Sequence, residues 1–150
     1  MDRIVEESAH YARVIVRGGP VTDGPLASGA FYRPSLIEVE DLDAPIIQQE
    51  VFGPVATFEV FDSESEAIHR ANATEFGLAA AVFTRDVDRA RRVSRQIHAG
   101  TVWTNTWFAV SDGFEEGGYK QSGIGRLRGR GLSEFQEIKT YVQLVPPEET

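Results

Sequence analysis

Hydrophobic and polar residues follow two different periods in the middle of the chain, and these periods predict its secondary structure. Short apolar and β-branched runs predict strands over residues 55–61, 78–84 and 101–105, and the second run is apolar enough for a fully buried strand. Between them, apolar residues recur at spacings of three and four, which is typical of helices with one buried face. The order strand, helix, strand, helix, strand predicts a parallel βαβαβ core and an α/β fold.

Local signals place the starts of both helices. Ser63 and Glu66 form a capping box, which predicts a helix over residues 63–73. Asp86 is expected to cap the second helix through its side-chain oxygen. The inward face of that helix is predicted to carry Val87, Ala90, Val93 and Ile97.

The flanking segments predict further strands and one irregular region. Apolar runs at residues 14–16 and 30–39 predict two strands before the central pattern. Glycine density rises and periodicity disappears over residues 111–131, which indicates an ordered, closely packed loop. Weak alternation over residues 140–145 predicts a last strand.

Composition narrows the class of protein. A chain of 150 residues with 41% hydrophobic content is large enough for one folded domain. Its net charge of -8 argues against a nucleic-acid partner, because phosphate binding needs an excess of basic residues. The charged N-terminus and the short apolar run at residues 78–83 predict neither export nor membrane insertion. The absence of cysteine excludes disulfides and fits a reducing compartment, so the cytoplasm is the expected location.

Several common kinds of site are not expected. The three histidines, His10, His69 and His98, stand on separate predicted elements, so no metal site is expected. The glycine-rich stretch lacks the spacing of a phosphate-binding loop, and no Gly-x-Ser-x-Gly elbow is present. An independent nucleotide-binding module is therefore the weakest of the functional hypotheses.

One turn with a restricted backbone contains candidate ligand-binding residues. Gly53 and Pro54 restrict the backbone just after Glu50 and Phe52. A carboxylate there can accept hydrogen bonds from two ribose hydroxyls, and an aromatic ring can lie against a nicotinamide. The residues alone favour the simpler interpretation, a surface glutamate beside a core phenylalanine.

Four motifs, which follow one another along the chain, favour the ligand-binding interpretation over the simpler one. Residues 50–55 are followed by Gly77-Leu78, by Asn105, and by the irregular glycine-rich block of residues 117–126. Together they resemble the C-terminal part of an aldehyde dehydrogenase, an NAD(P)-dependent family that oxidises an aldehyde to a carboxylic acid. The resemblance implies that residues 1–139 are part of the catalytic domain. It also implies that residues 140–150 form an oligomerisation strand and tail in a homo-oligomer.

The resemblance assigns roles to five residues. It implies that Glu50 holds the nicotinamide-side ribose and that Phe52 contacts the nicotinamide ring. It places Leu78 near the same pocket, although a buried strand residue is the simpler interpretation. It also places Trp107 and Phe108 in the substrate channel, with plain packing as the alternative. Asn105, by contrast, is interpreted as a turn residue rather than a catalyst.

The chain also departs from the family pattern. Glu115 and Glu116 stand where the family has a Pro-Phe pair, which puts the packing there and the substrate channel in question. Leu127 follows Arg126 where the family usually has glutamate, so the corresponding ion pair is not expected.

The missing cysteine separates two functional hypotheses. In the family's reaction, as the resemblance implies it, a cysteine attacks the aldehyde, hydride passes to nicotinamide, and a glutamate activates the water that releases the acid. In the first hypothesis the chain is a C-terminal fragment of such an enzyme. The catalytic cysteine and glutamate would then lie upstream of it, and NAD or NADP would be the cofactor. The second treats it as an inactive truncated remnant that associates with full-length relatives. On either hypothesis the isolated chain is expected to be inactive.

Overall fold

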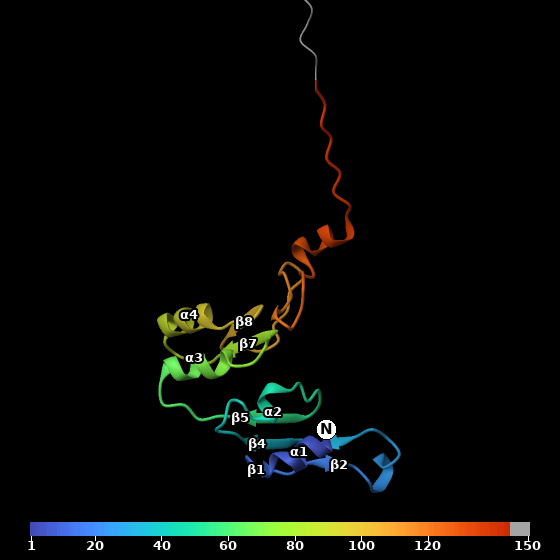
Figure 1. Ribbon diagram of the computed structural model, residues 1–150, viewed down its shortest axis with the longest axis vertical. Coiled ribbons are helices and arrows are strands. Elements are labelled where there is room, and N and C mark those ends of the chain that lie inside the picture. Colours follow the sequence, from blue (N-terminus) through green and yellow to red (C-terminus); the bar gives the residue numbers. More distant parts are fainter. Residues whose placement is uncertain (145–150) are drawn as a thin grey trace, which may run out of the picture.

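The computed structural model describes residues 1–144, apart from the side chain of Arg130, and shows two groups of elements joined by one connection (Figure 1). We call residues 2–58 the N-terminal unit and residues 64–135 the C-terminal unit. The N-terminal unit contains α1 (Asp2–Ser8), β1 (Arg13–Val16), β2 (Gly19–Pro20), the 3-10 helix η1 (Gly24–Leu26), β3 (Tyr32–Arg33), β4 (Ser35–Glu38), α2 (Pro45–Gln48) and β5 (Val55–Phe58). The C-terminal unit contains α3 (Glu64–Asn72), β6 (Phe76–Gly77), β7 (Ala79–Val82), α4 (Val87–Gln96), β8 (Thr101–Thr104), β9 (Tyr119–Lys120) and the 3-10 helix η2 (Gly129–Phe135).

The N-terminal unit is built on a three-stranded sheet. Strand β4 lies in the centre, antiparallel to β1 and parallel to β5, and Ser35 pairs with Val55 at the start of the parallel ladder. Side chains from the sheet and from both helices form its core, namely Val5, Ile37, Val39, Ala44 and Ile46. The predicted strand over residues 30–39 is divided into β3 and β4 at Pro34, which has no N–H to donate to a ladder.

The C-terminal unit is built on two parallel strands and two helices. Strands β7 and β8 pair in register from Ala79 opposite Thr101, and α3 and α4 lie side by side along them (Figure 1). The Glu64 carboxylate joins the helices, because it accepts hydrogen bonds from Arg92 at 2.6 and 2.8 Å. These bonds lower the pKa of Glu64.

Both predicted helix caps are confirmed. The Ser63 hydroxyl accepts from the amide of Glu66 at 3.1 Å, while the Glu66 carboxylate accepts from the amide of Asp62 rather than from that of the cap residue. The Asp86 carboxylate accepts from the amides of Asp88 and Arg89, at 3.0 Å each. These first-turn bonds satisfy amides that have no partner within the helix and lower the pKa of Asp86.

The α/β fold class with parallel strands is confirmed, although β5 does not pair with β7. Strand β5 pairs with β4, and β7 pairs with β8, so within residues 1–144 the two parallel ladders belong to separate sheets. The period of a sequence predicts strands, but which strands become neighbours depends on all the segments available to pair. Strands β5 and β7 each have one edge without a partner among the described residues.

The predicted burial is also wrong in two places. Residues of β7 are only partly buried, and Leu78 and Phe83, which flank this strand, are 58% and 69% exposed. Val87, expected on the inward face of α4, is exposed, whereas Ala90 on the same helix is buried. The segment 78–84 has the composition of a strand covered on both faces, and the described part of the chain covers it incompletely.

The last predicted strand is not formed among the described residues. Residues 136–144 run away from both units in Figure 1, and residues 140–144 pair with no strand. Val145, the end of that prediction, lies outside the described residues. A strand needs a partner for its backbone N–H and C=O groups, and residues 1–144 supply none here.

Candidate functional site

The turn after α2 holds the first two candidate residues. The amide of Val55 donates to the carbonyl of Gly53 at 2.7 Å, and the amide of Ser35 donates to the carbonyl of Pro54 at 3.0 Å. These bonds fix the turn against the start of β4. Phe52 has a φ of 51°, a conformation that costs energy for a residue with a Cβ and so requires support from its surroundings.

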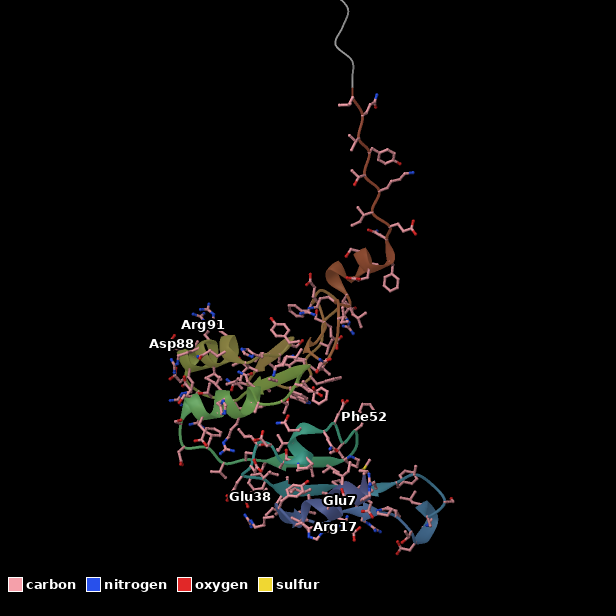
Figure 2. The ribbon with its side chains drawn as sticks, viewed as in Figure 1. Glu7, Arg17, Glu38, Phe52, Asp88 and Arg91 are labelled. Atoms are coloured by element: carbon pink, nitrogen blue, oxygen red, sulfur yellow. The ribbon has the colours of Figure 1, made fainter. Side chains whose placement is uncertain are left out.

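Glu50 and Phe52 are both presented to solvent. The Phe52 side chain is 86% exposed, and Figure 2 shows it projecting from the turn on the side that faces the C-terminal unit. The Glu50 carboxylate is exposed and has no hydrogen-bond or ion-pair partner within residues 1–144. The simpler interpretation of Phe52 as a core residue is therefore wrong for this chain. An unpaired carboxylate next to a solvent-exposed aromatic ring can contact a ligand.

Leu78 lies in the wall of a cavity rather than in the core. The cavity has a volume of about 420 Å³, and Leu78 shares its lining with the glycine-rich block, including Gly117, Gly118, Ser122 and Ile124. The interpretation of Leu78 as a buried strand residue is not supported, because more than half of the side chain is exposed.

The glycine-rich block is packed tightly on the start of β7 and β8. A Cβ at Gly100 would lie 1.6 Å from the carbonyl oxygen of Gly117, and a Cβ at Gly118 would lie 2.6 Å from Ser122. The Ser122 hydroxyl accepts from the amide of Gly77 at 2.9 Å. The Lys120 ammonium group donates to the carbonyls of Asn72 and Thr74, at 3.0 and 2.7 Å. The prediction of close packing is confirmed for Gly117 and Gly118, whereas a Cβ at Gly123 or Gly125 would meet its nearest atom at 3.6 Å, an ordinary van der Waals contact.

Three aromatic residues gather at the end of β8. The rings of Trp103 and Trp107 meet edge to face with centroids 5.0 Å apart, and Phe108 lies 6.5 Å from Trp103. Trp107 and Phe108 are 59% and 71% exposed, and Phe108 has a φ of 56°. The structure thus brings both predicted substrate residues to one exposed surface. Trp103 completes this group, and its place in a strand gave no sequence signal for that role.

Asn105 joins the ends of β7 and β8. Its side-chain oxygen accepts from the amide of Thr84, and its side-chain nitrogen donates to the carbonyl of Thr84, both at 2.8 Å. Asn105 also has a φ of 54°, which asparagine tolerates better than most residues. The interpretation of Asn105 as a turn residue is confirmed.

Two of the three residues that depart from the family pattern, Glu116 and Leu127, lie opposite each other. The main chain of Glu116 pairs with that of Leu127 in both directions, at 2.9 and 2.7 Å. The Glu116 carboxylate lies 3.6 Å from the guanidinium of Arg128, which also contacts Asp112 at 3.3 Å. Arg126 instead donates to the carbonyls of Gly118 and Gly125.

The candidate residues form two groups on different units. Glu50 and Phe52 belong to the N-terminal unit, whereas Leu78, Trp107 and Phe108 belong to the C-terminal unit. Among the side chains described, two hydrogen bonds cross between the units, from Arg70 to the Glu40 carbonyl and from Gln48 to the Ala73 carbonyl, at 3.2 Å each. Among the described residues, no hydrogen bond, ion pair or ring contact joins the two groups of candidates.

Within residues 1–144, no three His, Asp or Glu side chains come together in a way that could hold a metal ion. No helix in this part of the chain has the length and apolar content needed to cross a bilayer.

Several solved structures are similar to this chain in fold and in sequence. A betaine aldehyde dehydrogenase from Staphylococcus aureus matches with a TM-score of 0.81 and 43% identity, over 89% of this chain and 27% of that one. A double mutant of the same enzyme in complex with NAD+ matches with a TM-score of 0.82 and 38% identity, over 99% and 32%. A protein from Burkholderia cenocepacia assigned to the aldehyde dehydrogenases matches with a TM-score of 0.77 and 37% identity, over 87% and 27%.

The family follows from the sequence match. The model of the aldehyde dehydrogenase family matches residues 1–141, which is nearly the whole chain, and the chain belongs to this family. It spans about a third or less of the length of the solved relatives described above.

Proposed function

We propose that this chain is the C-terminal part of an NAD(P)-dependent aldehyde dehydrogenase that oxidises an aldehyde to a carboxylic acid. The observation that carries the proposal is the family match over residues 1–141, together with the exposed Glu50 and Phe52 on a fixed turn. An S. aureus relative was solved with NAD+, which supports a nicotinamide nucleotide as the cofactor.

The residues on the turn fit such a cofactor. The Glu50 carboxylate has free acceptor positions for two vicinal ribose hydroxyls, and the Phe52 ring offers an open face for a planar ring. When bound, the cofactor would accept the hydride removed from the aldehyde carbon. In our proposal Glu50 and Phe52 orient its nicotinamide end, Leu78 borders the same space, and Trp107 and Phe108 contact the aldehyde.

The nucleophile would come from outside these residues. The chain contains no cysteine, so the thiol on which the family's reaction depends would be supplied by another part of the protein. We therefore expect the 150-residue chain alone to be inactive. We further propose that the complete enzyme is cytoplasmic and a homo-oligomer, for which residues 140–150 supply the oligomerisation strand and tail.

The first test is the intact mass of the native polypeptide. It would be captured from its source with an antibody against residues 117–131, and a mass several times 16.6 kDa is expected. In that protein, Glu50→Gln should raise the KM for the nicotinamide nucleotide about tenfold or more, since two hydrogen bonds to a charged acceptor are lost. Glu40→Gln, a change at another exposed carboxylate, is the control. An unchanged KM in Glu50→Gln would contradict the role of Glu50.

A second candidate function is favoured by the exposed apolar surface. Ile124, Phe135, Ile138 and Leu144 are each more than four-fifths exposed, and β5 and β7 each have one edge without a partner among residues 1–144. Such a surface suits association with another polypeptide. A native mass near 16.6 kDa would favour this alternative, an inactive remnant that binds full-length relatives. Co-purification of a larger aldehyde dehydrogenase with the short chain would support it.

A further inference from the structure

The only sulfur atom of the chain lies against the turn that contains Glu50 and Phe52. The sequence has one methionine, Met1, and no cysteine. A Cβ added at Gly53 would lie 1.9 Å from the Met1 Cε and 2.7 Å from its Sδ. The thioether therefore fills the space that a side chain at Gly53 would need, and Figure 1 shows the N-terminus beside this turn.

The main chain of Met1 holds the side chain in this position. Met1 is the N-terminal cap residue of α1, and its carbonyl accepts a hydrogen bond from the amide of Val5 at 3.2 Å. The Val5 side chain is fully buried in the core of the N-terminal unit. The start of α1 is thus fixed on the core, and the thioether reaches the turn from a fixed backbone.

The turn requires support where Met1 contacts it. Phe52 has a φ of 51°, which costs energy, and its side chain is 86% exposed, so its own packing contributes little support. Main-chain hydrogen bonds hold the turn from the carbonyl of Gly53 onward, and Val51 packs on the core before it. The Met1 thioether covers the backbone between these two anchors.

The thioether is also accessible to an oxidant, because Met1 is 40% exposed. A peroxide can transfer one oxygen atom to it. A lone pair of the sulfur forms the S–O bond, the O–O bond breaks, and the other oxygen takes up the proton and leaves as water. The sulfur loses two electrons, and the peroxide gains them. The product, methionine sulfoxide, is polar and can be reduced again by methionine sulfoxide reductases.

Oxidation changes how this side chain can pack. A thioether is apolar and adapts to the surface that it covers. A sulfoxide oxygen needs a hydrogen-bond donor, and the glycine Cα that it would face offers none of useful strength. We expect the oxidised side chain to turn toward water and to uncover Gly53. Phe52 then loses part of the support for its positive φ.

We infer that Met1 is a reversible oxidation site that controls the order of the turn containing Glu50 and Phe52. The observation that supports this inference is the contact between the Met1 thioether and Gly53. Met1 acts through the turn, so it is a positioning residue. Weaker binding of a nicotinamide nucleotide by the oxidised protein is the functional consequence, and this step rests on the proposed function. The oxidation and its effect on the turn do not.

The direct test is amide hydrogen exchange in the 150-residue chain before and after treatment with hydrogen peroxide. At a concentration that oxidises free methionine, the intact mass should increase by one oxygen atom. The amides of Val55 and Ser35 report on the turn, because they donate to the carbonyls of Gly53 and Pro54. They should exchange about threefold or more faster after oxidation, and methionine sulfoxide reductase should restore the original rates.

Two controls separate this effect from general damage. The amides of Asp88 and Arg89, which donate to Asp86 in the other unit, should keep their exchange rates. In Gly53→Ala the added Cβ displaces the thioether, so the turn amides should already exchange faster, and oxidation should change them little further. If Met1 stays unoxidised, or if the turn amides of the oxidised chain exchange as before, the inference is overturned.

The complete enzyme allows a second measurement, the Kd for NADH followed by its fluorescence. Peroxide should raise this Kd about threefold or more in the unmodified enzyme relative to Met1→Leu, because leucine has a similar volume and no sulfur. Other sulfur atoms are oxidised alike in both proteins, so the difference reports on Met1. An equal rise in both would overturn the inference. An enzyme that binds no NADH before oxidation would contradict the proposed function, and the exchange measurement would still decide the oxidation site.

Discussion

Replacement of Gly100 by alanine tests whether the glycine-rich block is fixed to β8. The added Cβ would lie 1.6 Å from the carbonyl oxygen of Gly117 and 2.7 Å from its carbonyl carbon. Both atoms belong to the main chain, so no side-chain rotation relieves the clash. The two segments would have to separate by more than an ångström.

The expected cost has two parts. Overpacking of this kind typically costs about 1–3 kcal/mol. The separation also weakens the hydrogen bond from the Gly100 amide to the carbonyl of Gly77, now 3.0 Å, which contributes about 1 kcal/mol. We therefore expect Gly100→Ala to lower the free energy of unfolding of the C-terminal unit by roughly 2–4 kcal/mol.

The assay is urea unfolding followed by tryptophan fluorescence. Trp103 lies in β8, so its emission reports on the unit in question. Gly113→Ala is the matched control, because a Cβ there meets no atom within 4 Å. It should stay within about 0.5 kcal/mol of the unmodified chain. If Gly100→Ala were as stable as Gly113→Ala, the block would not be packed on β8 as described.

Two further predictions concern other parts of the C-terminal unit. Asn105→Ala should destabilise it by about 2 kcal/mol, because both bonds to Thr84 are lost and alanine is strained at positive φ; thermal unfolding measures this. Acid should also weaken the contact between α3 and α4. Hydrogen bonding to Arg92 lowers the pKa of Glu64 in the folded state, so its contribution to stability is present above the ordinary carboxyl pKa and is lost as the pH falls through the lowered value. Glu64→Gln should flatten this acid limb in unfolding curves recorded at a series of pH values.

The sequence was most informative where structure depends on neighbours along the chain. Ser63 and Asp86 cap their helices as predicted, because each side chain needs only amides two or three residues away. The conformation of Asn105 was predicted for the same reason. In the glycine-rich block, Gly117 and Gly118 were correctly interpreted as closely packed, although the segments they contact were not predicted.

Prediction failed where structure depends on distant segments. The division of the strands into separate sheets, and the exposure of Leu78 and Phe83, depend on which parts of a protein lie against them. Trp103 lines a cavity of about 320 Å³ together with Glu115 and Glu116, which are far enough from it in sequence that no spacing rule links them. The family resemblance found Glu50 and Phe52, which local spacing alone did not favour over a structural role.

Few side-chain hydrogen bonds join the two units, and this affects how a ligand would act on them. Arg70 and Gln48 each contribute one side-chain hydrogen bond to this boundary, so the units should behave as two bodies on a hinge at residues 59–63. A cofactor that touched Phe52 on one body and Leu78 on the other would act as a brace between them. Its binding would then slow amide hydrogen exchange throughout both bodies, including at residues that do not contact the ligand.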